Sequence, residues 1–139
     1  MSLTLFSCLT GKEARTMASI PELLESNLHR VFGAKNDDDR HTAVLETYAD
    51  QVTFTDPEGT SVGIRSVEAR ARALSEAAPA DFRFIKDGPV YVGDHNGAQA
   101  WALGPEGGEP VARGIDFVTV ESGKITSVIT LLTEMSKDV

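Results

Sequence analysis

Apolar residues in the first half of the chain recur with the period of an amphipathic helix. In the clearest case, Leu24, Leu28 and Val31 fall on one side of a segment that starts after Ser19, a good N-cap, and ends at Gly33. Similar stripes of apolar positions predict two further helices, over about residues 40–49 and 65–78. The first part of the chain is therefore predicted to contribute three helices.

The remaining segments alternate apolar and polar residues, as strands do. One of them, Val52–Asp56, lies between the second and third helices. After the third helix, turn signals such as Asn96-Gly97 separate further segments of this kind. These segments cover about residues 82–85, 89–93, 98–103, 110–121 and 124–132. This order of elements predicts an α+β domain with three helices on one face of a curved antiparallel sheet.

Length and composition favour one folded domain. The chain has 139 residues, of which 41% are hydrophobic and 24% are charged, as in ordinary globular proteins. Residues 1–16 have no clear period, whereas the first helical pattern opens just after Met17. We therefore expect residues 1–16 to be an N-terminal extension and residues 17–139 to form a single domain.

Charge and cysteine content exclude several classes of function. With a net charge of −8, the chain lacks the basic surface that nucleic acids and anionic membranes require. No apolar run approaches the roughly 18 residues of a membrane span. The single cysteine, Cys8, cannot form an internal disulfide or a multi-cysteine zinc site. This cysteine usage fits a reducing compartment, and we expect a cytoplasmic protein.

Two aspartates lie where the strand pattern calls for apolar residues. Asp56 shares a strand face with Val52 and Phe54, and Asp116 shares one with Val118. Burial raises the pKa of a carboxyl group, and a neighbouring carboxylate raises it further. Two such groups beside each other would supply one proton acceptor and one proton donor near neutral pH. Asp56 and Asp116 are therefore the main candidates for catalytic residues.

A structural role is the alternative for both aspartates. Asp56 precedes Pro57, so its side chain would simply cap backbone N–H groups of a turn. The opposite face of the Asp116 strand is also apolar, with Ile115 and Phe117. In that orientation Asp116 would be a structural residue paired with an arginine.

Tyr48 and His41 are weaker candidates for catalytic residues. They lie on one side of the predicted second helix, from which they would reach the interior. The histidines have no metal-ligand spacing, so we expect no metal site. No nucleotide-binding or phosphate-binding glycine motif is present, so we expect no cofactor.

Two stretches of sequence resemble one known group of proteins. The first is Tyr48–Gly59, followed by Gly63 and a helix, and the second is Gly114–Ile125. Both resemble the SnoaL-like and ketosteroid-isomerase-like proteins of the nuclear-transport-factor-2-like superfamily, over about residues 20–134. The resemblance implies a conical sheet that encloses an apolar pocket. It also implies a homodimer formed through the outer face of the sheet.

The resemblance also implies roles for individual residues. Asp56 falls at the position of the general base of ketosteroid isomerase. Asp116 falls at the position of a protonated acid that donates a hydrogen bond to the dienolate oxygen. The tyrosine that this enzyme carries on its first helix has no counterpart, because Val31 and Phe32 stand there. Tyr48 or His41 would then assist.

An epoxide hydrolase of the same superfamily is a less favoured interpretation. Those enzymes use an arginine and an aspartate on one strand face, whereas Arg113 and Asp116 are out of phase.

The sequence therefore predicts a protein that binds a small apolar molecule and acts on it by acid–base catalysis. An isomerase or a cyclase with a steroid-like or polyketide-like substrate fits best. The alternative is a non-catalytic binding or dimerisation module with structural aspartates. The expected pocket walls are Leu24, Leu28, Phe54, Trp101, Val118, Val128, Thr130 and Leu132.

Overall fold

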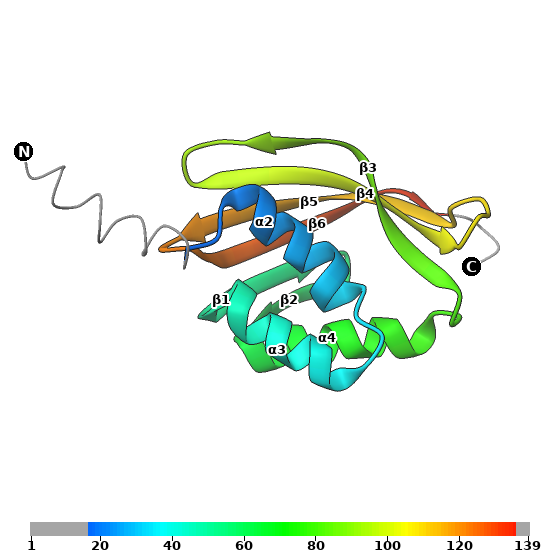
Figure 1. The fold of residues 1–139 in the computed structure, drawn as a ribbon, viewed down its shortest axis with the longest axis horizontal. Helices are drawn as coiled ribbons and strands as arrows, with labels where there is room; N and C mark the ends of the chain where they lie inside the picture. The colour runs from blue at the N-terminus through cyan, green and yellow to red at the C-terminus, as the bar shows by residue number, and fades with distance from the viewer. Residues whose placement is uncertain (1–16, 136–139) are drawn as a thin grey trace, which may run out of the picture.

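A computed structural model describes residues 17–135 (Figure 1). The helical elements are α2 (Ile20–Glu25), the π-helical η1 (Ser26–Phe32), α3 (Asp37–Thr47) and α4 (Ile64–Ala77). The strands are β1 (Tyr48–Asp56), β2 (Gly59–Val62), β3 (Phe82–Val92), β4 (Asn96–Pro105), β5 (Ala112–Glu121) and β6 (Lys124–Met135). Since η1 continues α2 directly, residues 17–135 contain the three helical segments that the sequence predicts.

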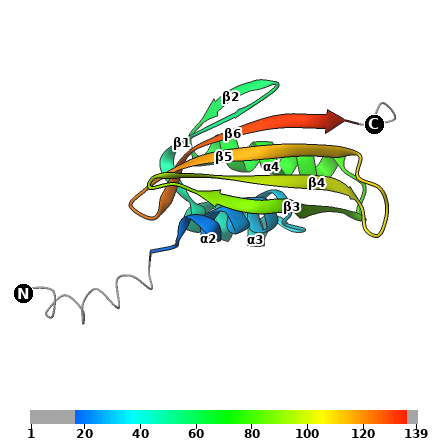
Figure 2. The same cartoon turned by 90° about the horizontal axis from the view of Figure 1, so that it is seen from above.

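The strands form one curved sheet that does not close. It has six strands in the order β2-β1-β6-β5-β4-β3. The helices lie on the inner side of the curve, as Figures 1 and 2 show. This arrangement confirms the predicted α+β cone. The expectation of a wholly antiparallel sheet is wrong at one place, because β1 and β6 are parallel. Between β1 and β6 the chain passes through β2, α4, β3, β4 and β5, and β6 then runs beside β1 in the same direction.

The first helix begins as the sequence predicts and ends in an unexpected geometry. The Ser19 side chain accepts the backbone N–H of Glu22, whose carboxylate accepts the Ser19 N–H at 2.8 Å. These reciprocal bonds form a capping box. At the other end, the Gly33 N–H donates to the carbonyl oxygen of Leu28, five residues earlier. This wider π-helical turn is common at functional sites and has no clear sequence signal.

Three boundaries differ from the predicted ones. Tyr48 belongs to β1 and not to the preceding helix. Beyond the Asp56 turn the chain returns as the short strand β2, which pairs with β1. Residues 82–92 form one strand, because a register shift between Lys86 and Val90 absorbs the break in alternation.

The main core lies between the sheet and the helices. Its buried side chains come from every helical element and from β1, β5 and β6. They are Leu23, Leu24, Val31, Ala43, Val44, Tyr48, Val52, Phe54, Val67, Ala71, Val118, Val120, Ile125 and Val128. No helix among residues 17–135 is long and apolar enough to cross a membrane.

Arg40 joins the end of η1 to the start of α3. Its side chain is 2% exposed. The guanidinium donates to the carbonyl oxygens of Val31 at 3.2 Å and Ala34 at 3.0 Å, and it pairs with Asp37 at 2.7 Å. A planar fork of donors is needed to meet three acceptors in different directions.

We expect Arg40→Lys to lower the free energy of unfolding by about 1–3 kcal/mol, because one ammonium group leaves buried carbonyl oxygens without partners. Thermal denaturation against Arg65→Lys, a replacement at an exposed position on α4, measures the difference. Equal melting temperatures for the two variants would contradict this role of Arg40.

Candidate functional site

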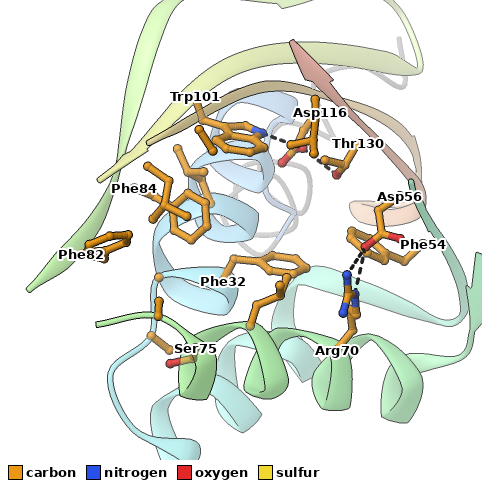
Figure 3. Close-up of a pocket in the computed structure, with 18 of the residues that line it drawn as sticks. Phe32, Phe54, Asp56, Arg70, Ser75, Phe82, Phe84, Trp101, Asp116 and Thr130 are labelled. Carbon is orange, nitrogen blue, oxygen red and sulfur yellow. Dashed lines mark hydrogen bonds and ion pairs between the residues drawn. The ribbon is translucent and has the colours of Figure 1, made fainter. Parts of the chain in front are cut away.

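A cavity of about 500 Å³ lies between the helices and the inner face of the sheet. Its volume is within the range of pockets that hold small organic molecules. Apolar and aromatic side chains form most of its wall, and Asp116, Asp56 and Arg70 are the charged groups that Figure 3 labels there. The cavity therefore combines an apolar interior with a few charged groups.

Asp116 comes from β5, on the face that also carries Val118. Its carboxylate accepts three hydrogen bonds: from Trp101 Nε1 at 3.0 Å, from Thr130 Oγ1 at 2.8 Å and from Asn27 Nδ2 at 2.8 Å. Trp101 and Thr130 are held in place by the neighbouring strands β4 and β6, since Asp116 pairs with Thr130 in register. The strand alternation that singles out Asp116 in the sequence thus places it on the inner face.

The environment of Asp116 acts on its pKa in two directions. Burial raises the pKa of this carboxyl group above its ordinary value, because the charged form loses its hydration. The hydrogen bonds from Thr130, Trp101 and Asn27 oppose this rise by stabilising the carboxylate. The net direction is upward, so the pKa of Asp116 lies above that of an ordinary aspartate.

Asn27 is a site residue that the sequence analysis missed. Its amide lies between Asp116 and Tyr48, whose hydroxyl donates to Asn27 Oδ1 at 2.6 Å. Asn27 is 1% exposed and Tyr48 is 2% exposed. The signal was present, because Asn27 lies three residues after Leu24 and is therefore a polar residue on the apolar side of the first helix.

The Trp101 indole fits over the backbone of β5 because residue 114 is a glycine. A Cβ at Gly114 would lie 2.4 Å from Trp101 Cζ2, which is closer than carbon atoms approach. Phe84 meets the same indole edge to face at a centroid distance of 5.5 Å. These contacts hold the ring with its N–H directed at Asp116.

Asp56 lies at the end of β1 and is held by Arg70 of α4. The Arg70 Nε and Nη2 atoms lie 2.9 and 2.8 Å from Asp56 Oδ2, and Asp56 Oδ1 accepts the backbone N–H of Glu58 at 2.9 Å. Burial lowers the pKa of Arg70, but the hydrogen bond and charge of Asp56, with a contribution from Glu58, raise it overall. Asp56 thus makes the turn-capping bond of the structural interpretation and lines the cavity as well.

Asp116 makes no ion pair with an arginine in the part of the chain that the structure describes. Arg113 points to the other side of β5 and pairs with Asp87 at 2.7 Å and Glu134 at 3.0 Å. Arg113 and Asp116 are therefore out of phase, as the sequence predicts.

The cavity brings together only part of the predicted site. Its wall includes the predicted residues Leu28, Phe54, Asp56, Trp101, Asp116, Thr130 and Leu132. Leu24, Val118 and Val128 are instead part of the main core. The prediction failed for these three because strand and helix patterns identify an inner face but not whether a helix covers it. Tyr48 lies behind Asn27, also in the core.

His41 lies away from the cavity. Its side chain is 60% exposed and meets the Glu68 carboxylate of α4 at 3.1 Å. The expectation that His41 reaches the interior is wrong, because α3 has a weakly one-sided pattern and turns this residue toward α4 and solvent. Among the described residues, no three His, Cys, Asp or Glu side chains are grouped as a metal ion would need.

Solved structures share this fold. A candidate isomerase of the SnoaL-like family from Agrobacterium tumefaciens is 22% identical, covers 81% of this chain and 96% of its own, and has a TM-score of 0.75. A candidate SnoaL-like polyketide cyclase from Jannaschia is 15% identical over 84% and 89% of the two chains, with a TM-score of 0.64. At this identity the likeness shows the fold alone.

The family is shown by a match between the sequence and a family model. No curated protein matches it significantly. The family model described as the SnoaL-like domain matches residues 28–128, which include α3, α4, five complete strands and most of the residues that line the cavity. This stretch begins at Leu28 on the cavity wall and contains both aspartates. The chain therefore belongs to the SnoaL-like domain family, with the nuclear-transport-factor-2-like fold.

Proposed function

We propose that this protein is an enzyme in which Asp116 moves a proton next to a carbonyl group of an apolar substrate. The observation that carries the proposal is a buried carboxyl group on the wall of an apolar cavity, held by three donors. Such a group is the minimum requirement for an isomerase or a cyclase that works through an enolate. Asp56 also lines the cavity, with a side chain that is 8% exposed, but its charge is paired with Arg70.

The number of hydrogen bonds that Asp116 accepts supports its role as the base. A carboxylate offers about four acceptor positions, and three are used by Asn27, Trp101 and Thr130. One position is left for a proton of the substrate. The raised pKa of Asp116 lets the same group return the proton afterwards. The surrounding donors stabilise the carboxylate, which favours the base over the protonated donor that the family resemblance implies.

Asp56 is suited to a supporting role. Its two contacts to Arg70 and its bond from the Glu58 N–H compensate its charge and hold the carboxylate in place. We propose that the Asp56–Arg70 pair binds a polar substituent of the substrate. The guanidinium of Arg70 is the donor that can meet an oxygen on which negative charge develops.

The aromatic side chains on the cavity wall favour a flat, ring-containing substrate. Figure 3 shows Phe82 and Phe84 on the side of the cavity opposite Asp56 and Arg70. Phe32 stacks on Phe54, with ring centroids 5.3 Å apart. Aromatic walls of this kind pack against rings. The polyketide cyclase and isomerase descriptions of the structural relatives support the same choice.

The first experiment is a thermal-shift screen with steroid enones, polyketide-like aromatic compounds and terpenoid ketones. A ligand at about 100 times its Kd should add about 2.7 kcal/mol to the free energy of unfolding. Compounds that bind are then assayed for turnover with Asp116→Asn, Asp56→Asn and the exposed control Asp94→Asn.

We expect Asp116→Asn to bind the same compounds and to lose turnover by about 100-fold or more. Asp56→Asn should lose less turnover but also unfold at a lower temperature, since a charge-assisted contact to Arg70 is lost. Asp94→Asn should match the wild type. Turnover by Asp116→Asn within threefold of the wild type would refute the proposal. If no compound binds, the non-catalytic module becomes the better explanation.

We also propose that the protein forms a homodimer through the outer face of the sheet, the face opposite the helices. Tyr91, Ala98, Phe117 and Ile129 lie in one row across four strands on this face. Tyr91 is 65%, Phe117 40% and Ile129 44% exposed. An apolar row of this size on a sheet marks an interaction surface.

Phe117→Glu should convert the dimer into a monomer, because a two-fold interface places the new charge on both partners. Light scattering after size-exclusion chromatography measures the mass. Leu45→Glu, a charge at an exposed leucine on α3, is the control and should remain dimeric. A monomeric wild type at tens of micromolar protein would rule out this assembly.

A further inference from the structure

We propose that Asn27 is a positioning residue that holds Asp116 as a proton acceptor, and that the Tyr48 hydroxyl fixes the direction in which Asn27 points. This inference rests on the proposed acid–base role of Asp116. Its test needs no substrate, however, so the two can fail separately. The chain of contacts runs from β1 through η1 to β5, entirely inside the protein.

The first step concerns Tyr48. The side chain is buried, and its hydroxyl lies 2.6 Å from Asn27 Oδ1. A buried hydroxyl that does not donate loses the free energy of its hydrogen bond with water. Burial, with a smaller effect of the Asp116 charge, raises the pKa of Tyr48 well above its ordinary value. The hydroxyl therefore keeps its proton and stays a donor throughout the range in which a carboxyl group titrates.

The second step concerns the Asn27 amide. Because Oδ1 accepts from Tyr48, the amide presents Nδ2 to Asp116, 2.8 Å from Oδ2. The opposite orientation would place an NH₂ group against the tyrosine O–H and an oxygen against the carboxylate. An amide nitrogen donates only, so it stabilises the ionised form of Asp116 over the protonated form. Tyr48 thus acts on Asp116 through a group that it does not touch.

The third step concerns the other groups near Asp116 that could shift its pKa. From β1, Tyr48 and Asp56 are the titratable groups on this side, and from α4 it is Arg70, which is paired with Asp56. Two more charged residues line the cavity: Glu58 meets Arg70 at 3.2 Å, and the Lys35 ammonium donates to the Phe82 carbonyl oxygen at 2.9 Å. Gln99 and Trp101 of β4 and Thr130 of β6 face Asp116 and carry no charge.

The charged residues of η1 and β5 are directed elsewhere. On η1, His29 meets Glu25, and Arg30 meets Glu46. On β5, Arg113 lies on the opposite face. The donors to Asp116 are therefore expected to decide how strongly it holds its proton.

The sequence supplies an internal reporter for this proton. Trp101 is the single tryptophan, and its indole N–H donates to Asp116 Oδ1. Its fluorescence, followed from pH 3 to pH 9, should change as Asp116 titrates. Asp116→Asn should abolish this change. If the change persists in Asp116→Asn with the same midpoint, Asp116 is not the group bonded to Trp101 and the proposal is wrong.

The decisive variant is Tyr48→Phe. It removes the hydroxyl and allows the Asn27 amide to turn its oxygen toward Asp116, so the carboxylate loses a donor. Loss of a donor to the charged form raises a carboxyl pKa, and the fluorescence midpoint should move up by about one pH unit. Tyr91→Phe is the matched control, because Tyr91 is the other tyrosine and is exposed. Its midpoint should equal that of the wild type.

Asn27→Ala provides a second measurement, which remains available if Tyr48→Phe does not fold. It removes the donor itself and should raise the midpoint at least as much. A midpoint within 0.2 pH units of the wild type in either folded variant would overturn the proposal. Once a substrate is known, the acid limb of the kcat profile should move by the same amount in Tyr48→Phe, whereas a merely structural role would lower activity equally at every pH.

Discussion

A carboxyl group can lie among apolar side chains only where hydrogen-bond donors replace the water that it loses, and Asp116 imposes this constraint on the centre of the fold. Its three donors come from η1, β4 and β6. None of them is close to Asp116 in the sequence, so the site exists only when helix and sheet are assembled. The free energy of burying one charge thereby couples the packing of the first helix to the registers of three strands.

The same constraint accounts for features that have no other evident purpose. Gly114 gives the Trp101 indole its space, and without that space its N–H would not reach Asp116. The π-helical η1 contains both Asn27, which holds the carboxylate, and Leu28, which lines the cavity. A wider helical turn has a cost in backbone geometry, and such turns persist where the surrounding contacts favour them. The Asp116 end of the cavity is thus specified by the backbone as much as by side chains.

Much of this was predictable from local patterns. Strand alternation put Asp116 on one face with Val118, without deciding whether that face is the inner one, and the Ser19 cap and the apolar stripe located the first helix. Local patterns do not show whether an inward-facing side chain lies in the core or on the cavity wall. Val118 and Asp116 share a face of β5, yet Val118 belongs to the main core while Asp116 lines the cavity. The difference arises from which helix lies opposite, and periodicity within a strand does not contain that information. His41 was misplaced for a different reason, because α3 has polar residues nearly all round and its inner side is therefore hard to identify.

The cavity also has a boundary that the strands do not make. Ala78, Pro79 and Ala80, in the connection between α4 and β3, line it together with Phe82. Connections of this kind accept insertions and deletions more readily than core elements do. Lengthening or exchanging this short segment would alter the size and outline of the molecules that fit, while the carboxyl group and its donors stay unchanged. The dimensions of the cavity can therefore diverge among descendants of this chain by replacement of this connection alone.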